Sequence, residues 1–184
     1  MLTLSLPRVT PSTWAKAAGV LLFATITALS ARFTVVLPFT PVPLTLQVLA
    51  VVLGGLVLGA RGGFLAQALY LQAILLGAPL TAYGLGGPAA LLSPTAGYLL
   101  AFPVAAAAAG WIAERSMAGG RAPLALGGLA ALAVIYTLGT AWLSVSVGAG
   151  YAWALGVDPF LAADAMKVII AGGAGATGPA NWRY

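Results

Sequence analysis

The chain has 184 residues, of which 61% are hydrophobic and only 6% are charged, and its mean hydropathy is +1.04. Soluble domains carry about 25% charged residues, so this composition excludes a soluble globular protein and is typical of an integral membrane protein. The net charge of +5 comes from scattered basic residues and predicts no nucleic-acid partner, and the lack of histidine and cysteine argues against a metal or haem site and excludes disulfides.

Six apolar segments follow one another along the chain. They cover approximately residues 14–36, 43–60, 63–80, 92–112, 124–147 and 160 onward. The second and third are near the lower limit of about 17 residues for a membrane span, and could instead form a shorter hairpin turned at Arg61-Gly62. The last is apolar to Ala171 and then becomes rich in glycine. The sequence therefore predicts an all-α, six-helix transmembrane bundle that forms one integral membrane domain, residues 1–184.

The basic residues predict the orientation of this bundle. If the N- and C-termini are cytoplasmic, two basic residues, Arg32 and Lys167, lie toward the outside. The other six then lie inside, namely Arg8, Lys16, Arg61, Arg115, Arg121 and Arg183. This asymmetry follows the positive-inside rule. It places the turn-rich connections 37–43, 81–91 and 148–159 outside, where we expect them to roof a cavity.

Polar residues inside the apolar segments are the candidates for function. Asp164 and Lys167 are three residues apart, which places them on one face of a helix. An ion pair that only makes the span tolerable is the structural alternative, but ionisable residues in a span usually mark a binding site or pathway. Gln47 needs hydrogen-bond partners that a ligand or a neighbouring helix would supply equally well. Tyr98 is either an interfacial aromatic or a wall of the cavity.

The first segment carries a pair of small residues four positions apart, Ala24 and Ala28. Such a face lets helices approach closely, so it would serve either packing within the bundle or docking to a partner.

Taken in order, several short motifs resemble the BioY family, the biotin-binding membrane subunits (S components) of energy-coupling-factor (ECF) transporters. The motifs are PVPLTLQ at 41–47, LGARGG at 58–63, GAP at 77–79, GG at 86–87, SPTAGYL at 93–99 and PFxxxDxxK at 159–167. The resemblance implies a six-helix bundle in the plasma membrane that captures biotin from the outer face and is not an enzyme. It also implies a transmembrane coupling subunit and two ATPase subunits as partners, since the chain has no Walker A motif.

The same resemblance implies which residues meet the ligand. Carried over by position, these are Gln47, Tyr83, Tyr98, Asp164 and Lys167. Biotin is the transported ligand, and no cofactor is expected. An S component for another vitamin, a membrane enzyme of unknown chemistry and a structural or pore-forming protein are the competing functions.

Overall fold

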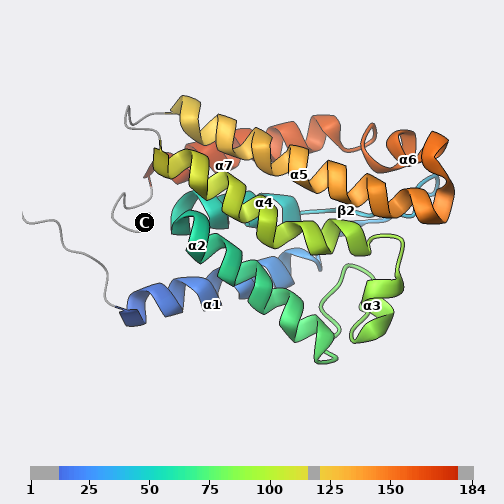
Figure 1. The fold of residues 1–184 in the computed structure, drawn as a ribbon, viewed down its shortest axis with the longest axis horizontal. Helices are drawn as coiled ribbons and strands as arrows, with labels where there is room; N and C mark the ends of the chain where they lie inside the picture. Colours follow the sequence, from blue (N-terminus) through green and yellow to red (C-terminus); the bar gives the residue numbers. More distant parts are fainter. Residues whose placement is uncertain (1–12, 116–120, 178–184) are drawn as a thin grey trace, which may run out of the picture.

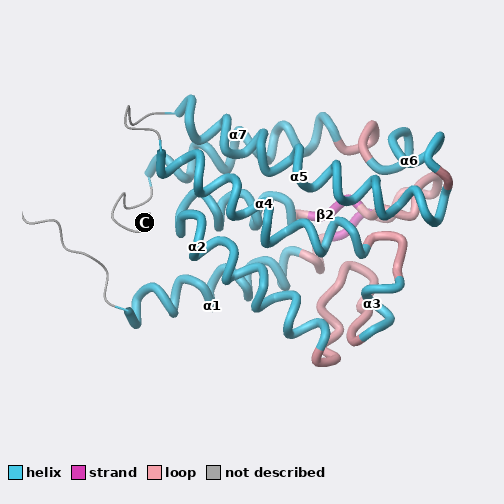
Figure 2. The backbone as a smooth tube through the Cα atoms, viewed as in Figure 1, coloured by secondary structure: helices cyan, strands magenta, loops and turns pink. Residues whose placement is uncertain are grey.

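The structure is a computed structural model that describes residues 13–115 and 121–177. Within these ranges the chain forms helices and one short two-stranded hairpin (Figures 1 and 2). In chain order the elements are α1 (Thr13–Ser30), β1 (Thr34–Val35), β2 (Leu44–Thr45), α2 (Gln47–Leu75), α3 (Pro88–Leu92), α4 (Ala96–Arg115), α5 (Arg121–Val147), α6 (Ala149–Gly156) and α7 (Leu161–Thr177). The predicted inner positions of Arg8 and Arg183 lie outside the described residues.

Helix α2 is broken at Gly59, where φ is 76° and ψ is −179°. This left-handed backbone conformation strongly favours glycine. A Cβ atom added at Gly63 would lie 2.8 Å from the Cα atom of Gly55, although eight residues of a straight helix rise about 12 Å. The two halves of α2 therefore fold back on each other. The second and third predicted segments form a helical hairpin, and its turn lies at Gly59 rather than at Arg61-Gly62.

Helix α4 packs directly against this turn. A Cβ at Gly110 would lie 2.3 Å from the carbonyl carbon of Gly59, so the two backbones are in contact. The Glu114 carboxylate accepts a hydrogen bond of 2.8 Å from the backbone N–H of Ala60, the first residue after the break. That bond satisfies an amide that the start of the second half of the helix would otherwise leave without an intrahelical partner.

The helices are layered around α4, which lies between α2 and α5 (Figure 1). Helix α1 packs on α2, and α7 packs on both α2 and α5. Small side chains allow this close packing, since the buried face of α4 is lined mainly by alanines: Ala101, Ala105, Ala106, Ala109 and Ala113. The glycine-rich end of α7 stays helical to Thr177, and Gly172 and Gly175 are buried against its neighbours.

The first predicted helix is too long, because α1 ends at Ser30 instead of continuing to residue 36. The chain next forms β1, which pairs antiparallel with β2 so that Thr34 faces Thr45. The β-branched residues at 34–36 favour a strand, and the prolines that follow cannot continue a helix. Residues 88–92 also form a separate short helix, α3, before α4 begins at Ala96.

In the described part of the chain, four helices are long and apolar enough to cross a membrane: α1, α2, α4 and α5. The all-helical fold class is therefore confirmed, and the chain has the features of a multi-pass membrane protein. The β-hairpin, α3 and α6 gather at one end of the bundle (Figure 1).

Candidate ligand-binding site

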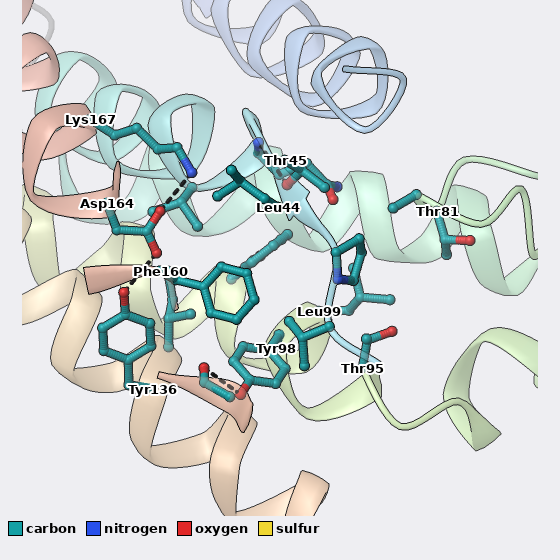
Figure 3. Close-up of a pocket in the computed structure, with 18 residues that line it drawn as sticks. Leu44, Thr45, Thr81, Thr95, Tyr98, Leu99, Tyr136, Phe160, Asp164 and Lys167 are labelled. Carbon is teal, nitrogen blue, oxygen red and sulfur yellow. Dashed lines mark hydrogen bonds and ion pairs between the residues drawn. The ribbon is translucent and has the colours of Figure 1, made fainter. Parts of the chain in front are cut away.

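A cavity opens between the helices beside the β-hairpin. Its empty space is about 600 Å³, including the part open to solvent. It is lined from β2 and the segment before it, from α2, α4, α5 and α7, from the end of α6 at Gly156, and from the connections around Thr81 and Thr95. Figure 3 shows Asp164 and Lys167 on one side of this cavity and Thr81 and Thr95 on the opposite side.

Asp164 and Lys167 form a buried ion pair on α7. The Lys167 ammonium donates to Oδ1 of Asp164 over 2.6 Å. The Tyr136 hydroxyl, from α5, donates to Oδ2 of the same carboxylate over 2.8 Å (Figure 3). Asp164 is only 3% exposed and Lys167 only 7%. Because lysine has three N–H donors and one is used here, two remain for a ligand acceptor.

Gln47 lies at the start of α2 and is also buried. Its amide nitrogen donates to the Tyr70 hydroxyl over 2.7 Å, and that hydroxyl donates to the carbonyl of Leu80 over 3.1 Å. This chain of hydrogen bonds orients the amide. Because the nitrogen serves Tyr70, the amide oxygen is the Gln47 atom suited to accept from a ligand N–H.

Tyr98 and Tyr83 have different positions. Tyr98 lines the cavity from α4, and its hydroxyl donates to the carbonyl of Gly156 over 2.9 Å, so its ring serves as a wall. Tyr83 does not line the cavity. It is 44% exposed, and its hydroxyl donates to the carbonyl of Pro41. This hydrogen bond links the connection that contains Tyr83 to the connection that contains Pro41.

The structure thus brings together four of the five predicted ligand residues, Gln47, Tyr98, Asp164 and Lys167, and leaves Tyr83 outside. Sequence reasoning missed Tyr136 and the three threonines Thr45, Thr81 and Thr95, which also line the cavity. Tyr136 had a usable signal. Its hydroxyl lies inside an apolar segment, where a buried polar group needs a partner, and Asp164 is that partner.

The rest of the cavity is apolar. Its walls include aliphatic and aromatic side chains from the β-hairpin, α4, α5 and the residue just before α7: Val42, Leu44, Leu99, Phe102, Ile135 and Phe160. A largely apolar cavity with a few fixed polar groups is typical of sites for small amphipathic molecules. The described residues therefore define a membrane protein with a cavity suited to a small molecule that has both donors and acceptors.

The predicted docking pair lies elsewhere, on α1. Ala24 is 8% exposed and belongs to the buried core, and Ala28 is half-buried and packs against the same core. The side of α1 that faces outward carries larger residues, among them Leu21, Leu22 and Leu29.

Comparison with known proteins agrees with this class. The model of the BioY family matches residues 6–182. A probable biotin transporter BioY of Pyrococcus horikoshii is 42% identical over 153 residues, which cover 83% of this chain and 88% of the relative. A biotin transporter BioY of Rhizobium etli is 34% identical over 159 residues, covering 80% of this chain and 83% of the relative. The chain belongs to the BioY family.

The fold also has a solved counterpart. A 2.1 Å crystal structure of the S-component for biotin from an ECF-type ABC transporter superposes with a TM-score of 0.79. The superposition covers 90% of this chain and 93% of that one at 21% sequence identity. Membership in a family of transporters agrees with the prediction that the chain is not an enzyme, and with its assignment as a multi-pass membrane protein.

Proposed function

We propose that this chain is the biotin-binding S component of an ECF-type uptake transporter. It captures biotin from the outer face and relies on a coupling subunit and two ATPase subunits for import. The observation that carries the proposal is the cavity that joins the Asp164–Lys167 pair to an apolar, aromatic wall. Membership in a family whose relatives are described as biotin transporters supports the choice of ligand.

The chemistry of biotin suits these groups. Its ureido ring has two N–H donors and one carbonyl acceptor, its thiophane ring and chain are apolar, and its carboxylate is anionic. The Asp164 carboxylate and the Gln47 amide oxygen accept from N–H groups, and the Lys167 ammonium donates to either a carbonyl or a carboxylate. The walls around Leu99 and Phe160 bury the apolar part.

Calorimetric titration of the purified protein with biotin tests this function directly. We expect saturable binding of one biotin per chain, and mass spectrometry of the untreated protein should find biotin copurified. A different vitamin copurified and bound in its place would make the chain an S component for that vitamin. The absence of any small-molecule binding would contradict the proposal.

The proposed function also includes six spans with both termini in the cytoplasm. The proposal counts the two halves of α2, which fold back on each other at Gly59, as two short spans, and counts α7 as the sixth. We expect an Arg121→Cys variant to react with an impermeant maleimide only after cells are permeabilised, and an Asp158→Cys variant to react in intact cells. The chain has no native cysteine to interfere. Labelling of Arg121→Cys in intact cells would reverse the orientation.

Tyr136 is proposed to position the Asp164 carboxylate for the ligand. We expect Tyr136→Phe to weaken biotin binding by about 1–2 kcal/mol, because one oxygen of a buried carboxylate loses its donor. Calorimetry measures the change. The matched control is Tyr151→Phe, an exposed tyrosine on α6, which should bind as the parent does. Equal affinity in Tyr136→Phe and the parent would show that Lys167 alone orients the carboxylate.

Ala24 of the predicted docking pair is buried in the core and so packs within the bundle, and we propose that only the half-buried edge of α1 at Ala28 docks the coupling subunit. Ala28 is the better test, because Ala24 is the more deeply buried and a tryptophan there would overpack the core. We expect Ala28→Trp to abolish copurification with the coupling subunit while the affinity for biotin is unchanged. Leu29→Trp, on the exposed side of the same helix, is the control and should assemble normally. Loss of biotin binding in Ala28→Trp would show that this face packs only within the bundle.

A further inference from the structure

The side chain of Tyr98 lies in a recess formed by two buried glycines. Gly139 is on α5, and Gly156 is the last residue of α6. A Cβ atom at Gly139 would overlap three ring atoms of Tyr98, and its distance to Cζ would be 2.6 Å. A Cβ atom at Gly156 would overlap the hydroxyl oxygen, which is held by its hydrogen bond of 2.9 Å to the carbonyl of the same glycine. The tyrosine therefore occupies the space that side chains at these two positions would take.

Gly139 does not itself line the ligand cavity, because the Tyr98 ring covers it. Ile135 and Tyr136 line the cavity from α5. Gly139 follows them by four and three positions, so it lies on the same face of the helix. The Tyr98 ring, which also lines the cavity, thus lies between Gly139 and the cavity (Figure 3). How closely the ring approaches Gly139 decides how far this wall stands from a ligand.

Other contacts hold α4 and α5 together around this ring. A Cβ atom at Gly97 would lie 2.7 Å from the carbonyl oxygen of Leu138, so the two backbones are close to each other here. The indole N–H of Trp142 donates to the carbonyl of Ser93 over 3.0 Å, which links α5 to the segment before α4. If position 139 carried a side chain, the ring would therefore move more readily than the helices, and the cavity is the open space beside it.

We propose that Gly139 is a positioning residue that sets the width of the cavity through Tyr98. The inference rests on the proposed function, because it concerns the space that is available to biotin. Carbon atoms pack at about 3.5–4.0 Å, so a methyl group at position 139 would push the ring about 1 Å into the cavity. Even alanine, the smallest side chain, would narrow the site.

The test combines calorimetric titration with biotin and the Tm of the unliganded protein. Both are measured for the parent, Gly139→Ala, Tyr98→Val and the double variant. We expect Gly139→Ala to weaken biotin binding about tenfold or more and to lower the Tm. Tyr98→Val removes every ring atom that the new methyl group would overlap, so in that background Gly139→Ala should lower neither the affinity nor the Tm. If Tyr98→Val binds too weakly to titrate, the Tm values carry this comparison.

Gly127→Ala is the matched control, since it is the same substitution at another contact of α5 with α4. A Cβ atom there would lie 2.7 Å from the carbonyl oxygen of Ala109, and neither residue lines the cavity. This variant should have a lower Tm but bind biotin as the parent does.

Three results would overturn the proposal. The first is an equal loss of affinity in Gly127→Ala, which would assign the effect to separation of α4 and α5. The second is unchanged affinity in Gly139→Ala, and the third is an undiminished effect of Gly139→Ala in the Tyr98→Val background. If the parent itself binds no biotin, the proposed function is wrong. The Tm values of the four proteins then decide by themselves whether Gly139 positions Tyr98.

Discussion

Replacing either member of the buried ion pair should reduce biotin affinity more than any other single change in the cavity. We expect Lys167→Ala and Asp164→Asn each to lose about 2–5 kcal/mol of binding free energy, roughly 30-fold to several-thousand-fold in Kd. The two groups are 2.6 Å apart and almost completely buried. Removing one of them therefore leaves the other charge buried without its partner, and it also removes a proposed contact to the ligand. Calorimetric titration measures the losses.

The double variant should lose less than the sum of the two single losses, because both residues act on the same ligand groups and on each other. Matched controls are available on the same segment. Met166→Ala shortens an exposed side chain next to Lys167, and Asp158→Asn neutralises an exposed acid before α7. Both should bind biotin as the parent does. If the two single variants stay folded without ligand and still bind as tightly as the parent, the pair is structural and the site assignment is wrong.

The second large effect should come from a single methyl group at Gly110. In Gly110→Ala, the new Cβ would lie 2.3 Å from the carbonyl carbon of Gly59 and 2.4 Å from the nitrogen of Ala60. Backbone atoms cannot move aside as a flexible side chain does, so α4 must separate from the α2 turn. Overpacking of this kind costs about 1–3 kcal/mol or more. We expect a lower Tm for the purified protein, followed by the fluorescence of its five tryptophans.

Gly173→Ala is the matched control, since it is the same substitution in another helix. A Cβ at Gly173 meets no atom of the described residues within 4 Å, so the added methyl group should be neutral or raise the Tm through the better helix propensity of alanine. A Gly110→Ala variant as stable as Gly173→Ala would contradict the close contact between α4 and the α2 turn.

Much of the site could be expected from the sequence because charged and polar residues are rare in this chain. Asp164, Lys167 and Gln47 each lie in apolar sequence, where an unpaired polar group is costly. The sequence therefore predicts that each of them has a polar partner, either another residue or a ligand. Their convergence on one cavity could not be derived in the same way. Gln47 and Lys167 are 120 positions apart in the sequence, and no local pattern reports the helix packing that brings them to one cavity.

Tyr83 and Tyr136 illustrate the limit most clearly. Both are tyrosines near or within apolar segments, and their positions along the chain do not indicate which of them lines the cavity. The fold turns Tyr83 toward the carbonyl of Pro41 and directs Tyr136 at the Asp164 carboxylate. A partner far away in the sequence decides the role of each hydroxyl.

The sequence by itself determined the membrane class, the all-helical architecture and the polar pair on the last helix, because each depends on composition or on spacing within one element. Only the tertiary structure decided the rest. The turn of α2 is placed at Gly59 by the approach of α4, with Gly110 against its backbone and Glu114 on the freed amide of Ala60. The end of α1 at Ser30 is accompanied by pairing of β1 with β2, in which Thr34 faces Thr45 and Val35 faces Leu44. The β-branched residues and prolines after α1 also favour its end locally, but the contact of α4 with the α2 turn joins distant segments and has no signature in either segment alone.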